Sequence, residues 1–285
     1  MKPAKSTYRK AKNALVNILA TVSAFIGIVF LVWILYVVVQ RGISSLNPAF
    51  FTQLPTPPGI PGGGLANAIA GTLALTFVAT LLGIPVGILS GVYLSEFGLT
   101  SLLGRSVRFT LNVIMGIPSI IIGLFVYTIL VLPTGHFSGY SGAVALAIIM
   151  LPVVARTTED MLNLVPNALR ESALALGASR WKVTLNIVFR SAKAGMITGV
   201  LLAVARVSGE TAPLLFTALN NPYWPSSFSE PTANLTVTIF NYAMSPFPDW
   251  QAAAWGASLL IMLFVLSVTI LVRLISRERI YRRRV

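Results

Sequence analysis

Six long apolar segments limit what this chain can fold into. They run from about residue 14 to 40, 68 to 94, 109 to 132, 141 to 155, 194 to 218 and 252 to 275. A helix needs about 20 apolar residues to cross the hydrocarbon core of a bilayer, and most of these segments reach that length. Because backbone polar groups must be satisfied internally in lipid, we expect an all-α polytopic membrane protein with six transmembrane helices.

The basic residues predict how the chain is threaded. Of the 21 Lys and Arg, five precede the first segment, two lie between the second and third, six between the fourth and fifth, and six follow the last. The other gaps hold one, none and none. Basic gaps stay in the cytoplasm, so we expect both termini there. The alternation favours a full crossing at 141–155, although that segment is short, contains Pro152 and also fits a re-entrant segment by hydropathy.

Composition excludes several classes of protein. The chain is 55% hydrophobic and 10% charged, which is typical of membrane proteins. Its net charge of +13 would suit a nucleic-acid binder, but the basic residues lie between the apolar segments, so we expect no nucleic acid partner. With no cysteine and one histidine, the sequence predicts no metal site. The first segment is too long for a signal peptide core and predicts a retained helix.

Three regions follow from this pattern. Residues 1–65 hold a cytoplasmic tail, the first span and an external loop. Residues 66–275 hold the other five spans and a polar stretch at 156–193, and residues 276–285 form a basic cytoplasmic tail.

Small residues and prolines shape the predicted spans. Gly83, Gly87 and Gly91 recur at four-residue spacing and let a neighbouring helix approach closely, within this chain rather than across a subunit interface. Pro85 and Pro118 predict kinks or local unwinding.

The polar stretch 156–193 predicts two helices separated by a tight turn. Pro166 suits the first turn of a helix and Gly177 suits its end. Ser179 can cap a second helix that runs toward Arg190 and the membrane. One face of the first helix carries three apolar residues, Leu169, Ala173 and Leu176. Spacing alone fits a surface that docks another protein and a connector that lies on membrane lipid equally well.

Two charged residues, Arg206 and Glu210, lie inside the fifth apolar segment. Each costs at least about 2.5 to 3.5 kcal/mol to insert at the bilayer centre, so they should face the bundle interior or an aqueous cavity. At positions i and i+4 they continue a stripe of small residues, Gly195, Gly199 and Ala203.

This charged pair is a candidate site for an anion. The Arg206 guanidinium is a planar fork that can bind an oxyanion through two hydrogen bonds, and Glu210 can hold the fork when the pathway is empty. The alternative interpretation is a bridge to another subunit. The candidate translocation residues are Arg206, Glu210, Ser208 and Thr211. Because Pro213 cannot donate to the Gly209 carbonyl, we expect helix hinges at Gly209, Pro213 and Pro118.

Four stretches resemble the PstA family of phosphate ABC importer permeases. They are 116–125 (GIPSIIIGLF), 151–160 (LPVVARTTED), 205–216 (ARVSGETAPLLF) and 241–247 (NYAMSPF). In addition, Glu171, Ala173 and Gly177, followed ten residues later by Ile187, are similar to the cytoplasmic loop of ABC importer permeases. The consensus of that loop is Glu-Ala-Ala, three residues, Gly, nine residues and Ile-x-Leu-Pro. This chain departs from the consensus at Ser172, which replaces the middle Ala, and at 189–190, where Phe-Arg replaces Leu-Pro. Without that proline, the bend that it usually makes is not expected from the sequence.

The resemblance implies a type I ABC importer permease fold in the inner (cytoplasmic) membrane. The helix before Gly177 would be a coupling helix that seats in an ATPase subunit through Glu171, Ala173, Leu176, Gly177 and Ala178. Its implied partners are a PstC-like permease, a PstB-like ATPase dimer, a PstS-like phosphate-binding protein and membrane lipid. ATP and Mg would be used by the ATPase, because this chain has no GxxxxGK[ST] loop and no bond chemistry or cofactor of its own.

Three alternatives stay open at this point. The first is an ABC permease for another oxyanion such as sulfate, molybdate or phosphonate. The second is a secondary transporter, which would usually show an internal repeat and a coupling-ion site, whereas Glu210 is the only intramembrane carboxylate expected. The third is a membrane scaffold or sensor that transports nothing.

Overall fold

A computed structural model describes residues 3–60 and 62–281, and within these ranges the chain contains helices and no strand. Five stretches are long and apolar enough to cross a membrane: Tyr8–Ser45, Ala66–Glu96, Gly139–Asn163, Arg180–Val207 and Pro248–Leu271. A sixth crossing is present if the bent pair Leu102–Gly116 and Ser119–Thr134 counts as one. The predicted all-α fold with six spans is confirmed, with one span broken.

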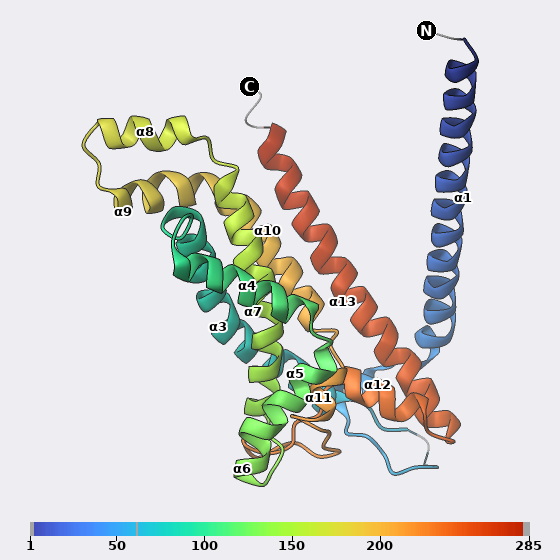
Figure 1. Cartoon of the computed structure of the whole chain (residues 1–285). Helices are drawn as coiled ribbons and strands as arrows, with labels where there is room; N and C mark the ends of the chain where they lie inside the picture. The colour runs from blue at the N-terminus through green and yellow to red at the C-terminus, as the bar shows by residue number, and fades with distance from the viewer. Residues whose placement is uncertain (1–2, 61, 282–285) are drawn as a thin grey trace.

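The N-terminal helix stands beside the bundle (Figure 1). It is α1 (Pro3–Gly42), and it is followed by a 3-10 turn at Ile43–Ser45 and by the short α2 (Pro48–Thr52). The predicted tail before residue 14 continues this helix from Pro3. Most of α1 is exposed, and it reaches the bundle near its end, where the Arg41 guanidinium lies 5.3 Å from the ring centre of Trp255.

The core is a pair of helices, α3 (Ala66–Glu96) and α7 (Gly139–Asn163). They pack along most of their length because the glycines of α3 meet α7: a methyl group added at Gly91 would lie 2.5 Å from the Ala155 carbonyl oxygen, and one at Gly87 would lie 2.8 Å from Val154 Cβ. Packing of this kind, rather than the hydrophobic effect, holds helices together in lipid. The expectation of a close contact within the chain is confirmed, and α3 stays helical through Pro85.

The fourth segment proves to be the most enclosed helix. Sequence hydropathy ends it at residue 155, but α7 continues for eight more residues to Asn163 and stays helical through Pro152. Its added turns include Thr158 and Glu159, which are buried. The re-entrant alternative for this segment is therefore excluded.

The third span is broken at Pro118. Helices α4 (Leu102–Gly116) and α5 (Ser119–Val126) meet at an angle of 106°, and a π-helical turn at Tyr127–Val131 and α6 (Leu132–Thr134) complete the segment. Ile117 is extended, with φ −77° and ψ 130°, as the residue before a proline prefers to be. The predicted kink at Pro118 is confirmed, and the helical segment begins at Leu102 rather than at residue 109.

The polar stretch and the fifth segment form a hairpin of helices followed by a break. Helix α8 (Asn167–Ala175) turns at Gly177 into α9 (Arg180–Val183), a π-helical stretch at Thr184–Phe189 and α10 (Arg190–Val207), and the short α11 (Ala212–Leu215) follows. The fifth apolar segment, 194–218, is broken, since α10 ends at Val207, close to the expected hinges at Gly209 and Pro213. Gly209 disfavours helix, and Pro213 fits only the first turn of a new one.

The two ends of the molecule differ (Figure 1). The start of α1, the end of α13 (Pro248–Tyr281) and the α8–α9 hairpin lie at one end, and α6, α11 and α12 (Leu235–Ala243) lie at the other. Of the predicted C-terminal tail, residues 276–281 continue α13, whereas 282–285 lie outside the described residues, as do 1–2 of the N-terminal tail.

In the loop before α12, hydrogen bonds from the Ser226 hydroxyl and N–H lower the pKa of Glu230.

Candidate functional site

The turn between α8 and α9 is built around Gly177. This residue has φ +82°, in the left-handed region that a side chain disfavours. Its N–H donates to the Leu174 carbonyl at 2.9 Å, and the Ala178 N–H donates to the Ala173 carbonyl at 3.2 Å, so the last carbonyls of α8 are satisfied. The predicted stop and turn at Gly177 are confirmed.

The exposed surface of the hairpin is apolar at its tip. Of the three residues placed on one face of α8, only Ala173 is buried, at 7% exposure, and it packs near Val183 and Val188. Leu169 is exposed, and Leu176 is 88% exposed, so only Ala173 of the expected apolar face is turned toward the bundle. Leu164, Leu174 and Trp181 are also exposed. Glu171 and Gly177 are also exposed, and Ala178 is half-buried.

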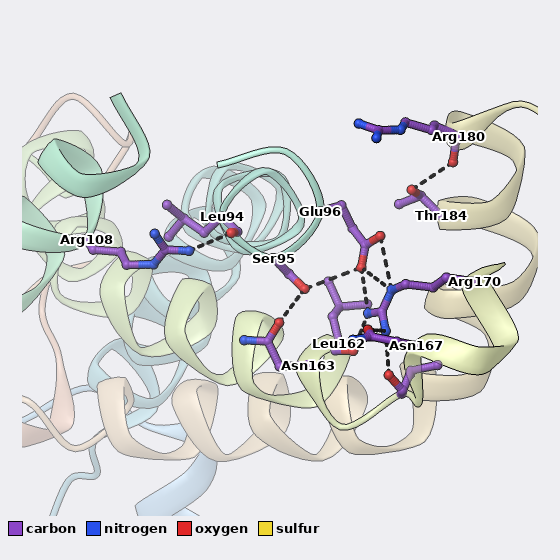
Figure 2. A network of polar contacts seen from close by, with 11 residues as sticks. Leu94, Ser95, Glu96, Arg108, Leu162, Asn163, Asn167, Arg170, Arg180 and Thr184 are labelled. Atoms are coloured by element: carbon purple, nitrogen blue, oxygen red, sulfur yellow. Dashed lines mark hydrogen bonds and ion pairs between the residues drawn. The ribbon is translucent and has the colours of Figure 1, made fainter. Parts of the chain in front are cut away.

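The inward face of α8 carries a charge instead (Figure 2). The Arg170 Nη2 atom donates to Glu96 Oε1 at 2.8 Å, and the two side chains are only 17% and 10% exposed. The same guanidinium donates to the carbonyls of Leu162, at 2.8 Å, and of Val165. Arg170 thus points toward the core, whereas Leu169 and Leu176 are exposed. Glu96 is the last residue of α3, so the pair joins the polar hairpin to the core.

A second buried ion pair lies at the same end of the bundle. Arg108 of α4 donates from Nε to Glu159 Oε1 of α7 at 2.7 Å, and from Nη2 to the Leu94 carbonyl at 2.6 Å. The sequence analysis did not predict either pair, because it assigned the basic residues to the gaps between apolar segments and did not look for their acidic partners. Glu96 and Glu159 lie where apolar segments border gaps with basic residues, and this position could have indicated the pairs.

Arg206 and Glu210 are placed together, but not in the predicted way. Their Nε and Oε1 atoms are 3.9 Å apart, and their side chains are 61% and 18% exposed. The face of α10 that carries the small residues repeats every three to four residues, so the next residue on it is Val207, which is buried. Arg206 lies on a neighbouring face of the helix, which is exposed. The expectation of one face that is small and then charged is wrong.

The break after α10 is fixed by neighbouring elements. The Ser208 hydroxyl donates to the Ala205 carbonyl at 2.8 Å, and the Thr236 hydroxyl at the start of α12 donates to the Glu210 carbonyl at 2.8 Å. Gly123 of α5 lies directly against the backbone of Pro213. Thr211 is half-buried and precedes α11. The break thus meets both the bent third span and α12.

Known proteins with similar sequences identify the family. Residues 83–281 match the model of the binding-protein-dependent transport system inner membrane component. The chain is 48% identical to the phosphate transport system permease protein PstA of Yersinia pestis, over 96% of this chain and 93% of that protein. It is 49% identical to PstA of Haemophilus influenzae, over 95% and 96% of the two chains. The chain belongs to the PstA family.

Other PstA relatives and solved structures agree with the fold. A probable PstA of Methanocaldococcus jannaschii is 35% identical over 98% of this chain and 99% of that protein. Inward-facing structures of the MetNI methionine ABC transporter include a chain that matches with a TM-score of 0.60 at 21% identity, over 77% of this chain and 95% of that one. A bacterial alginate ABC transporter contains another, with a TM-score of 0.57 at 15% identity, over 96% and 95%. The fold is therefore that of type I ABC importer permeases, and this PstA family member is a multi-pass membrane subunit.

Proposed function

We propose that this chain is a transmembrane permease subunit of an ATP-driven importer that carries inorganic phosphate across the inner (cytoplasmic) membrane. The observation that carries the proposal is identity of 48 to 49% to PstA proteins over 95 to 96% of the chain. The motifs at the bend near Pro118 and at the break near Gly209 both lie within the matched region.

The partners follow from this role. A PstB-like ATPase dimer binds ATP and Mg, a PstC-like permease completes the pathway, and a PstS-like protein delivers phosphate at the other side of the membrane. This chain binds no cofactor of its own. The exposed residues around the α8–α9 turn support an ATPase contact, because burial of Leu176 and Trp181 in a protein groove would remove their apolar surface from water.

The hairpin acts as the coupling element in this proposal. Glu171, Leu176 and Gly177 face outward and meet the ATPase, while Ala173 holds α8 onto α9 and its π-helical extension. Ala178 at the turn lies between the two. ATP binding closes the ATPase dimer, the hairpin moves with it, and the two permeases switch from inward-open to outward-open.

Arg206 and Glu210 are the proposed anion site. A guanidinium that is 61% exposed within a membrane protein requires a polar neighbour, and the surface between two permeases supplies one. When phosphate passes, the fork binds two of its oxygens, and between transport cycles Glu210 takes the fork back. Ser208 and Thr211 flank the pair, while Gly209, Pro213 and Pro118 are the proposed hinges.

The proposal is tested by uptake of radiolabelled phosphate into proteoliposomes that contain this chain, its partner permease, the ATPase and the binding protein. We expect uptake that requires ATP and Mg and is unaffected by excess sulfate. A matched control replaces the ATPase with a variant that binds but does not hydrolyse ATP. ATP hydrolysis without phosphate uptake would contradict phosphate as the substrate.

A further inference from the structure

The α8–α9 hairpin meets the rest of the protein through apolar packing and through one charged side chain. Ala173 and Val183 belong to an apolar cluster that includes Leu162 of α7, and Ile88 of α3 packs against it. The Arg170 side chain reaches the end of α3, 74 residues earlier in the chain. A movement of α8 therefore has a direct polar route to a core helix.

The Arg170 guanidinium binds two different parts of the protein at once. It donates to the carbonyl of Leu162, in the last turn of α7, at 2.8 Å, and to the carbonyl of Val165, in the segment that leads into α8. Its remaining donors meet Glu96, with Nε to Oε1 at 3.2 Å and Nη2 to Oε1 at 2.8 Å. A planar fork held on two sides has little freedom to rotate.

Glu96 lies at the C-terminal end of a helix, where a negatively charged side chain is unfavourable. It is the last residue of α3, where the helix dipole favours cations. Arg108 already satisfies the carbonyls there, with Nη2 to Leu94 at 2.6 Å and Nη1 to Gly98 at 3.2 Å. The Glu96 carboxylate therefore does not serve the helix end, and its ion pair with Arg170 is the contact that accounts for it.

The end of α3 is joined to its neighbours by side-chain hydrogen bonds. Ser95 donates to Asn163 Oδ1 of α7 at 2.8 Å, and Arg108 of α4 donates to the Leu94 carbonyl of α3 at 2.6 Å (Figure 2). Arg108 also binds Glu159 of α7 at 2.7 Å. Farther along, Gly87 and Gly91 lock α3 to α7. A displacement of Glu96 is therefore shared by α3, α7 and α4 rather than absorbed at one helix end.

We propose that the Glu96–Arg170 ion pair is the link that transfers movement of the α8–α9 hairpin to the α3–α7 core, with both residues acting as positioning residues. This inference rests on the proposed coupling to an ATPase. It assigns a role to two residues that lie away from both the ATPase surface and the Arg206–Glu210 pair.

The link is tested at Glu96, because Arg170 also binds the end of α7 and the segment before α8 through carbonyl contacts. Glu96→Ala removes the acceptor, and Glu96→Gln keeps a neutral oxygen that accepts more weakly. Arg105→Gln is the control, since Arg105 is an exposed arginine on α4 at the same end of the bundle. Each variant is assembled into the full complex, and phosphate uptake and ATP hydrolysis are measured on the same vesicles.

We expect Glu96→Ala to assemble normally and to hydrolyse ATP, while phosphate taken up per ATP falls by at least about fivefold, the lower range of coupling between sites. Glu96→Gln should fall between Glu96→Ala and the unmodified chain, and Arg105→Gln should match the unmodified chain. Unchanged uptake per ATP in Glu96→Ala would overturn the proposal. A parallel loss of assembly, hydrolysis and uptake would also overturn it, since the pair would then serve folding alone.

A second readout separates this inference from the choice of substrate. The chain has no cysteine, so a thiol introduced by Ala70→Cys, exposed near the far end of α3, is the only one in the permease. Its labelling by a maleimide should change on ATP addition, and Glu96→Ala should remove that change. If the unmodified complex imports no phosphate but still shows the ATP-dependent labelling, the substrate assignment fails and the link is still judged by the effect of Glu96→Ala.

Discussion

An arginine that is exposed on a membrane helix must be covered by something polar. Arg206 is in that position, and its 3.9 Å separation from Glu210 Oε1 is longer than that of the buried pairs Arg170–Glu96 and Arg108–Glu159 at 2.8 and 2.7 Å. A loosely held guanidinium can exchange its carboxylate for another oxyanion, whereas a tightly held, buried one is costly to separate. The longer separation and greater exposure of Arg206 support the anion exchange that we propose for it.

The residue scale gives a first prediction for Arg206→Lys. Lysine keeps the charge but loses the planar fork, so we expect phosphate uptake to fall at least about tenfold, the lower end of the range given by 1.5–3 kcal/mol for a hydrogen bond to a charged group. Assembly with the partner permease should stay unchanged, as measured by co-purification. Arg105→Lys serves as the matched control. Equal losses of uptake and assembly would instead identify the pair as a bridge between subunits.

At the scale of elements, the α8–α9 turn depends on one backbone conformation. Gly177 has φ +82°, whereas proline fixes φ near −65°, so Gly177→Pro has to rebuild the turn. We expect uptake to be abolished while membrane insertion and expression stay normal. Gly135→Pro imposes the same conflict at a residue with φ +74° at the opposite end of the molecule and should retain ATP hydrolysis. Full uptake by Gly177→Pro would contradict the coupling assignment.

The packing of α3 on α7 is a second element with a measurable consequence. A methyl group at Gly91 would lie 2.5 Å from the Ala155 carbonyl oxygen, whereas nothing lies within 4 Å of the same position at Gly27. Gly91→Leu should therefore destabilise the protein by about 1–3 kcal/mol or more through overpacking. Thermal unfolding of the purified protein in detergent tests this, with Gly27→Leu as the control. An equal change in Tm for both variants would argue against a tight α3–α7 contact.

At the scale of the whole molecule, the two ends predict an orientation. The α8–α9 hairpin, the start of α1 and the end of α13 share one end, and the positive-inside rule places the basic gaps there in the cytoplasm. Cysteines introduced by Leu99→Cys, in the α3–α4 loop, and by Ser229→Cys, in the loop before α12, are both exposed and lie at opposite ends. A maleimide that does not cross membranes should label Ser229→Cys in intact cells and Leu99→Cys only after lysis. The reverse pattern would invert the proposed topology.

The sequence by itself determined the number of spans, the polar hairpin and the stop at Gly177. These depend on hydropathy, on local charge and on the φ preference of one residue, all of which act over neighbouring positions. The proline at 118 also marked its bend, because proline restricts its own residue and the one before it.

Only the tertiary structure decided where α7 and α10 end and which charges pair. Helix α7 continues beyond its apolar segment because Glu159 forms an ion pair with Arg108, which is 51 residues away in the sequence. Arg170 faces inward because it binds Glu96, which is 74 residues away in the sequence. The Arg206 side chain is exposed because α10 turns its small-residue face, and Val207, toward the bundle. Such ion pairs form between helices that are distant in the sequence. The helix propensities and hydropathy of neighbouring residues therefore cannot predict them, because the partners meet only when the helices pack.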